Sequence, residues 1–358
     1  MSAVVLILIA CVPRHELNVV FVHYFDPSIQ FRADSDYMEQ NLGGLYNIDY
    51  SLESSESGGV NEPDFLLQLS NFSTWLRAQP EVVHVNTISD TMARLNKNMH
   101  GDDPEYYRQP QERELAAQYL LLYEMSLPYG LDLNNQLNVD KSATRLSVTV
   151  KVMSTNELLA FEKTTGKWLA DNAPKIITTG GSGPTMMFAN IGKRNVSSML
   201  MGTTLALIMI SIILIFALRS LKMGVTSLIP NLVPAAMGFG LWGLLVGEVG
   251  LSLSIVAGMT LGIVVDDTVH FLSKYLRARR EKGLSPEESV HYAFANVGYA
   301  LLTTSVVLIA GFLVLATSNF YLNSGMGMLT AIVIAFALIA DFLLLPPLLM
   351  KFEEKKHA

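Results

Sequence analysis

Two adjacent carboxylates, Asp266 and Asp267, lie inside an apolar segment that is long enough to cross a membrane. Residues 251–265, which precede them, contain no charged residue and no proline. One Asp near the middle of a spanning helix costs roughly 2.5–3.5 kcal/mol on insertion scales, so two in succession need a partner, a proton or a water-filled path. The alternatives are a surface loop or a buried ion pair in a soluble core, and the long uncharged run argues against both. These residues therefore predict proton transfer inside a membrane.

The same segment carries small and titratable residues at intervals of four. Gly258, Gly262, Asp266 and His270 consequently share one stripe of a helix. Small residues in such a stripe let helix backbones approach closely in lipid, so Gly258 and Gly262 are predicted to pack against another span. Asp267 lies about 100° further round the helix. Because Asp266 belongs to the packing stripe, it is the stronger candidate for the essential proton carrier.

Polar groups in the other apolar segments are candidate partners of the two carboxylates. Membrane threonines often bond to their own helix backbone, which competes with a role in proton transfer. An Asn between two prolines can equally satisfy carbonyls that the prolines leave free. Placement at the membrane interface competes with a role for His270, and simple solvation near the cytoplasmic end accounts for Asp341. The predicted proton relay comprises Asp266, Asp267, Thr303, Thr304, His270 and Asn231.

Composition excludes several classes of protein. Residues 13–195 contain 23 acidic and 15 basic residues, a net charge of −8, and such an acidic domain does not bind the phosphates of nucleic acid. The single cysteine, Cys11, can form no intrachain disulfide. No metal site, cofactor or hydrolytic triad is expected, because the other histidines are scattered along the chain. The protein is therefore not expected to be an enzyme.

Residues 196–350 form the predicted membrane domain. A spanning helix needs about 20 apolar residues, and five segments satisfy this requirement. Residues 1–12 are apolar but too short to span, so they are interpreted as a truncated transmembrane helix, and residues 351–358 as a cytoplasmic tail. The predicted spans are residues 197–218, 223–247, 251–272, 296–317 and 325–350.

The basic residues of the second half predict its orientation. They lie in the loops at 219–222 and 274–282 and in the tail from Lys351, whereas the loops near Glu248 and at 318–324 have none. The positive-inside rule places the basic loops in the cytoplasm. Residues 13–195 then lie outside, which in a bacterium is the periplasm.

Residues 13–195 have the pattern of a soluble α+β domain. A strand at 18–25 and a helix at 29–41 are predicted first. The order that follows is strand, helix, strand, helical insertion, strand, helix and strand, which is typical of the ferredoxin-like fold. Further on, Ser285-Pro286-Glu287-Glu288 predicts a capped short helix along the cytoplasmic surface. The predicted elements of the ferredoxin-like part are 46–53, 63–78, 82–87, 88–98, 110–125, 144–152, 155–172 and 175–179.

Several of these motifs resemble one transporter superfamily. The run from Gly262 to Asp267 resembles the Gly-x-x-x-Asp-Asp signature of the resistance-nodulation-division (RND) superfamily. It is most similar to the branch that contains MMPL lipid exporters, hopanoid transporters and sterol-sensing, Patched-like proteins. The further segments that carry the resemblance are Ile229 to Pro234, Ala300 to Ser305 and Phe31 to Gly44.

The resemblance implies a secondary active transporter of the inner membrane. Its aspartates would carry protons in antiport, while a periplasmic porter domain exports a hydrophobic or lipid-like substrate. RND proteins contain two halves of six spans each, and this sequence resembles the second half. The implied partners are protons, the substrate, membrane lipids, and either the missing N-terminal half, a partner subunit or further copies in a homo-oligomer. MMPL exporters often have Asp-Tyr in place of Asp266-Asp267, which leaves the substrate open.

Two other functions are compatible with the same features. One is a non-transporting sterol- or lipid-sensing membrane module. The other is an accessory subunit of a protein-translocation complex. A proton gradient is required only by the exporter.

Overall fold

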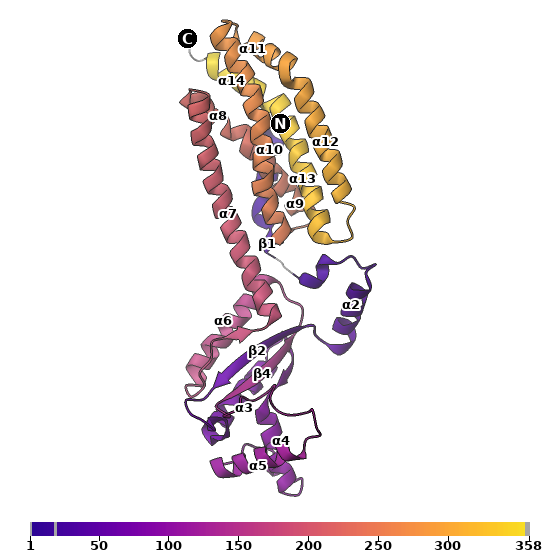
Figure 1. Cartoon of the computed structure of the whole chain (residues 1–358), viewed down its shortest axis with the longest axis vertical. Coiled ribbons are helices and arrows are strands. Elements are labelled where there is room, and N and C mark those ends of the chain that lie inside the picture. The colour runs from indigo at the N-terminus through magenta and orange to yellow at the C-terminus, as the bar shows by residue number, and fades with distance from the viewer. Residues whose placement is uncertain (1, 18–19, 355–358) are drawn as a thin grey trace. The chain divides into compact units, whose positions relative to one another are not determined.

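The computed structural model describes residues 2–17 and 20–354. These residues divide into two compact units (Figure 1). The helical unit comprises Met1–Ile29 and Gly192–Ala358, and the sheet unit comprises Gln30–Ile191.

The sheet unit is built around four antiparallel strands. Their order is β3-β4-β2-β5, with β2 (Tyr46–Glu53) and β4 (Ala143–Val150) in the centre. β3 (Val82–Asn86) and β5 (Gly181–Ser182) form the edges. Figure 1 shows β2 and β4 side by side. The unit also contains α2 (Gln30–Leu42), α3 (Pro63–Arg77), α4 (Ile88–Met99), α5 (Arg113–Ser126) and α6 (Thr155–Asn172).

Alternating apolar residues give the sheet one buried face. Ile48 and Tyr50 of β2 are completely buried, as are Leu146 and Val148 of β4. The ring of Tyr50 meets Phe72 of α3 edge to face at 5.9 Å, so α3 covers this face. Phe72 in turn stacks on Trp168 of α6 at 5.5 Å. Burial raises the pKa of the Tyr50 hydroxyl, as expected for a group removed from water.

Two predicted strands are wrong. The last strand does not occupy 175–179: Ile177 forms only an isolated bridge to Glu53, and pairing with β2 resumes at β5. Gly181 allows the close approach, because a Cβ there would lie 2.7 Å from Ile48. The strand predicted at 18–25 is replaced by β1 (Glu16–Leu17) and the 3-10 helix η2 (Phe21–Tyr24), with residues 18–19 outside the described chain.

The helical unit is that of a multi-pass membrane protein. Five helical stretches are long and apolar enough to cross a membrane, which confirms the predicted number. Their bounds are Pro184–Ala217, Met223–Leu245, Leu253–Glu281, Pro286–Leu315 and Tyr321–Lys351. The elements that form them are α7 (Pro184–Ala217), α8 (Leu221–Thr226), α9 (Leu228–Leu245), α10 (Leu251–Glu281), α11 (Pro286–Ala293), the π-helix η5 (Phe294–Gly298), α12 (Tyr299–Leu315), α13 (Tyr321–Ile339), the π-helix η6 (Ala340–Leu344) and α14 (Leu345–Glu354).

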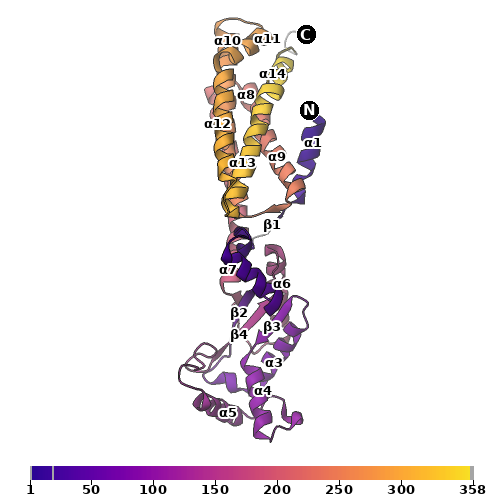
Figure 2. The same ribbon diagram turned by 90° about the vertical axis from the view of Figure 1, so that its right-hand side faces the viewer.

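The helix α13 lies at the centre of this unit. It packs against α12, α9 and α10, and Figure 2 shows it between α12 and α9. The shorter apolar helix α1 (Ser2–Ala10) packs against α9. By contrast, α7 and α12 leave most of their apolar side chains exposed. Such apolar surfaces match a lipid environment.

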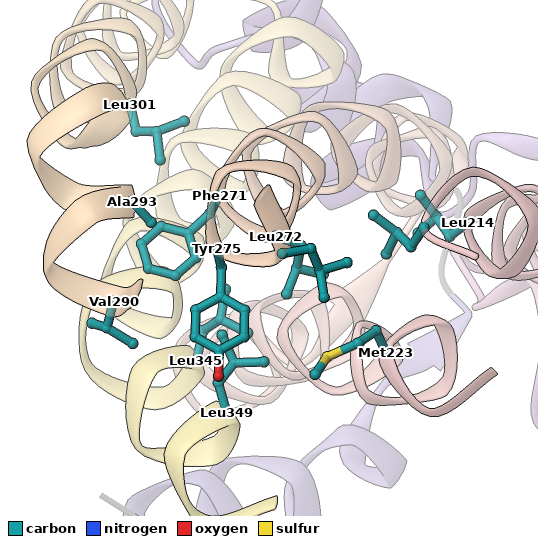
Figure 3. Close-up of a cluster of buried hydrophobic side chains, with 12 residues drawn as sticks. Leu214, Met223, Phe271, Leu272, Tyr275, Val290, Ala293, Leu301, Leu345 and Leu349 are labelled. Atoms are coloured by element: carbon teal, nitrogen blue, oxygen red, sulfur yellow. The ribbon is translucent and has the colours of Figure 1, made fainter. Parts of the chain in front are cut away.

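A cluster of buried hydrophobic side chains packs α7, α8, α10, α11, α12 and α14 together at the end of the bundle that carries the basic loops (Figure 3). Phe271 and Tyr275 of α10 are completely buried there, and the ring of Phe271 contacts Phe294 of η5 at 4.9 Å. The capping box predicted at Ser285 is confirmed, because Ser285 and Glu288 exchange hydrogen bonds with each other's backbone. The predicted surface helix is not separate, however: α11 continues through η5 into α12 as one stretch.

Gly327 lies at a close contact between α12 and α13. A Cβ at this position would lie 2.6 Å from the carbonyl oxygen of Phe312, which is a backbone atom that cannot move aside cheaply. We expect Gly327→Ala to lower the free energy of unfolding by about 1–3 kcal/mol through overpacking. Thermal unfolding of the purified protein in detergent measures this change. The control is Gly311→Ala in α12, where a Cβ would meet nothing within 4 Å; equal losses in both variants would contradict the packing.

The first turn of α6 should respond to acid. The backbone N–H of Ser154 donates to the Glu157 carboxylate at 2.8 Å, and this bond lowers the pKa of Glu157. The stabilisation is present above the unfolded pKa of about 4.3 and is lost as the pH falls through the lower folded value. The hydrogen-exchange protection factor of this turn, which compares its rate with that of an unfolded chain at the same pH, should therefore fall in acid in the unaltered protein and lose that dependence in Glu157→Gln. Asp171→Asn, at the other end of α6, should leave it unchanged.

Candidate functional site

Asp267 faces another helix of the bundle. Its side chain is half-buried, and its Oδ2 accepts a hydrogen bond of 3.3 Å from Ser305 Oγ of α12. Ser305 itself is buried, with 1% of its surface exposed. The hydrogen bond therefore joins two membrane-spanning stretches through a carboxylate.

Asp266 points away from the other described helices. Its side chain is 72% exposed, and its Oδ1 lies 3.5 Å from Nε2 of His270 on the next turn. His270 is also exposed, so the two groups form a polar strip on an apolar surface. The sequence favoured Asp266 as the proton carrier, but Asp267 is the member of the pair that contacts another span. Which of the two carries the proton stays a prediction.

Thr303 and Thr304 do not hydrogen-bond to the carboxylates in the described chain. The hydroxyl of Thr303 donates to the carbonyl of Tyr299 at 2.8 Å, and that of Thr304 to Ala300 at 3.0 Å. Both side chains are exposed. The third residue of the same Thr-Thr-Ser run, Ser305, is the one that meets Asp267, because each residue turns the side chain by about 100°. The sequence alone could not identify which member of the run faces the carboxylate.

The predicted packing of Gly262 against another span is also wrong for the described residues. A Cβ at Gly262 would meet nothing within 4 Å in this chain, so the predicted packing against another described span is absent. A Cβ at Gly258 would lie 3.4 Å from Thr203 of α7, which is an ordinary close contact. All four residues of the stripe are exposed, so the stripe runs along the outside of the helical unit. The four-residue spacing cannot tell whether a stripe faces a neighbour or the outside.

Asp341 is buried, contrary to the expectation that it is solvated. Only 2% of its surface is exposed, and Thr268 Oγ1 donates to its Oδ1 at 3.2 Å. Thr268 directly follows Asp267 in α10. Asp341 is the second residue of the π-helical turn η6, after which Leu345 N–H donates to the Ala340 carbonyl. Pro346 and Pro347 favour this geometry, because they lack the N–H groups that an α-helix would direct to residues 342 and 343.

Asn231 also lies in the interior, with 1% of its surface exposed. Neither its Oδ1 nor its Nδ2 has a hydrogen-bond partner among the described residues. Its helix, α9, packs against η6, which carries Asp341. The structure therefore places this predicted site residue inside the bundle without a direct bond to a carboxylate.

The chemistry that this arrangement offers is proton binding. Within residues 2–17 and 20–354, no three His, Cys, Asp or Glu side chains gather closely enough to hold a metal ion. A hydroxyl of α10 donates a hydrogen bond to one oxygen of Asp341. A hydroxyl of α12 donates to one oxygen of Asp267. Carboxyl groups of this kind inside a membrane are functional by default.

Residues 133–354, more than half of the chain, match the model of the MMPL family. The chain belongs to the MMPL family. The match includes Asn231, Asp267, Thr268, Ser305 and Asp341.

A relative of this MMPL protein occurs in Methanocaldococcus jannaschii, where it is named as a candidate membrane protein. The two sequences are 28% identical over 155 residues, which is 43% of this chain and 39% of the relative. The matched region thus spans well under half of the relative's length.

Proposed function

We propose that this MMPL protein is part of a proton-motive-force-driven exporter of a hydrophobic or lipid-like substrate. The observation that carries the proposal is Asp267, a half-buried carboxylate in an apolar helix that accepts a hydrogen bond from Ser305 of another span. A change in its protonation would make or break an interhelical contact. That is the local event that a proton-coupled movement of helices requires.

The membrane potential supplies enough free energy for such a step. Moving one elementary charge through 100 mV is worth about 2.3 kcal/mol. Two carboxyl groups that each carry one proton across this potential would double the free energy supplied. A population shift between two arrangements of the bundle needs free energies of this order.

The sheet unit is the proposed porter domain. Its strand order β3-β4-β2-β5, with α3 after β2 and α6 after β4, supports the ferredoxin-like fold expected for this domain. The basic residues that flank the spans favour the cytoplasm for their loops, and hence the periplasm of a bacterial inner membrane for the sheet unit.

The exposed polar strip supports a protein partner for the bundle. Asp266 and His270 are costly on a lipid-facing surface, whereas a facing protein could solvate or pair them. The second half of an RND-type transporter, a partner subunit or another copy of this chain would each provide such a surface.

Asp267→Asn tests the proposal directly. In vesicles that contain the complete transporter assembly, we expect loss of proton-dependent movement of a fluorescent phospholipid, because Asn cannot bind and release a proton. An uncoupler should abolish movement in the unaltered protein. Movement that survives both treatments would overturn proton coupling and favour a sensing or accessory role.

The contact between spans can be tested separately. Ser305→Ala removes the donor to Asp267, and a hydrogen bond to a charged group is worth about 1.5–3 kcal/mol. We expect roughly a tenfold or greater loss in transport rate and a shifted pH profile. Ser211→Ala in α7, whose hydroxyl donates to its own helix at Leu207, is the control. A loss in Thr304→Ala equal to that in Ser305→Ala would contradict the assignment.

A further inference from the structure

We propose that Asp341 is a second proton-binding group of the bundle, held by Thr268 and coupled through it to Asp267. This inference deepens the proposed function, because it rests on proton coupling through the bundle. It assigns a role to a residue that the sequence alone predicted to be solvated.

Burial and bonding make Asp341 a proton-binding group. One of its oxygens, Oδ1, accepts a hydrogen bond from Thr268, and the other, Oδ2, is buried without a hydrogen-bond partner among the described residues. An ionised carboxylate in this position would leave a charged oxygen unsolvated, which is costly. A proton on Oδ2 makes the group neutral. The observed geometry thus provides one oxygen for Thr268 and one for the proton.

The neighbouring elements join Asp341 to the Asp pair. Thr268 follows Asp267 in α10, so one short segment contacts two helices: Asp267 meets α12, and Thr268 meets η6. Asp341 is thus separated from Asp267 by one hydrogen bond and one step along α10. Two interacting carboxylates titrate as a pair, so ionisation of one disfavours ionisation of the other.

A second buried polar group supports an interior site. Asn231, with no hydrogen-bond partner in the described chain, belongs to α9, which packs against the π-helical turn of Asp341. Single π-helical turns occur frequently at functional sites. Unsatisfied buried polar groups in two packed elements point to an exchangeable ligand such as a proton or water.

The competing explanation is that Asp341 is purely structural. Asp341→Asn distinguishes the two, because the amide oxygen can still accept from Thr268 Oγ1 while the proton-binding oxygen is lost. A structural acid should tolerate this change. A proton-binding acid should not.

Infrared spectroscopy of the complete protein in vesicles tests proton binding without a substrate. At neutral pH the unaltered protein should show an absorption of a protonated carboxyl group that is missing in Asp341→Asn and that titrates away at higher pH. Asp267→Asn should shift the midpoint by about one pH unit, as expected for coupled sites. Asp266→Asn, which alters the outward-facing member of the pair, should shift it less.

Thr268→Val is the second variant, since it retains the acid and removes its hydrogen bond. It should shift the midpoint of the same absorption. The proposal is overturned if Asp341→Asn retains the full absorption, or if the midpoint is the same in Asp267→Asn, Thr268→Val and the unaltered protein.

Transport of the fluorescent phospholipid by the complete assembly provides the functional comparison. Asp341→Asn should lose proton-dependent movement, and Asp341→Glu should retain part of it. Full transport by Asp341→Asn would overturn coupling through Asp341 even if its carboxyl absorption is found. Full transport by Asp267→Asn would instead overturn the proposed function, so the two failures are distinguishable.

Discussion

The arrangement of the bundle depends on the cost of placing carboxylates in an apolar interior. An unpaired charge there is unfavourable by several kcal/mol, so each carboxyl group must be hydrogen-bonded, protonated or turned outward. The three acidic residues use these options differently. Asp267 accepts from Ser305, Asp341 accepts from Thr268, and Asp266 lies at the surface beside His270.

This constraint also explains why the proposed function is centred on α10. Within three consecutive residues, it presents a carboxylate outward, a carboxylate towards α12 and a hydroxyl towards η6. A helix turns by about 100° per residue, so the side chains of three consecutive residues point in three different directions and contact different parts of the structure. A rotation or shift of α10 would alter all three contacts together. Proton binding could thus be converted into helix movement without a long chain of intermediates.

Much of the fold was predictable because hydrophobic periodicity is strong in both units. The predicted bounds of β2 and α6 agree with the structure, and the capping box at Ser285 predicted where α11 begins. The irregular elements were not predictable. The late start of β5 depends on a close approach at Gly181, and the junction of α11 with α12 depends on a π-helical turn. Both result from tertiary contacts that leave little trace in local pattern.

The sequence by itself determined the number of spans and the presence of two carboxylates within one of them, because uncharged length and charge position can be read directly. It also carried the family resemblance. Only the tertiary structure decided which way each residue of the site faces: Ser305 instead of Thr304 meets Asp267, a Cβ at Gly262 would meet none of the described residues within 4 Å, and Asp341 is buried. The physical reason is that helical periodicity relates side chains to one another, whereas the direction of the whole pattern depends on how the helices pack.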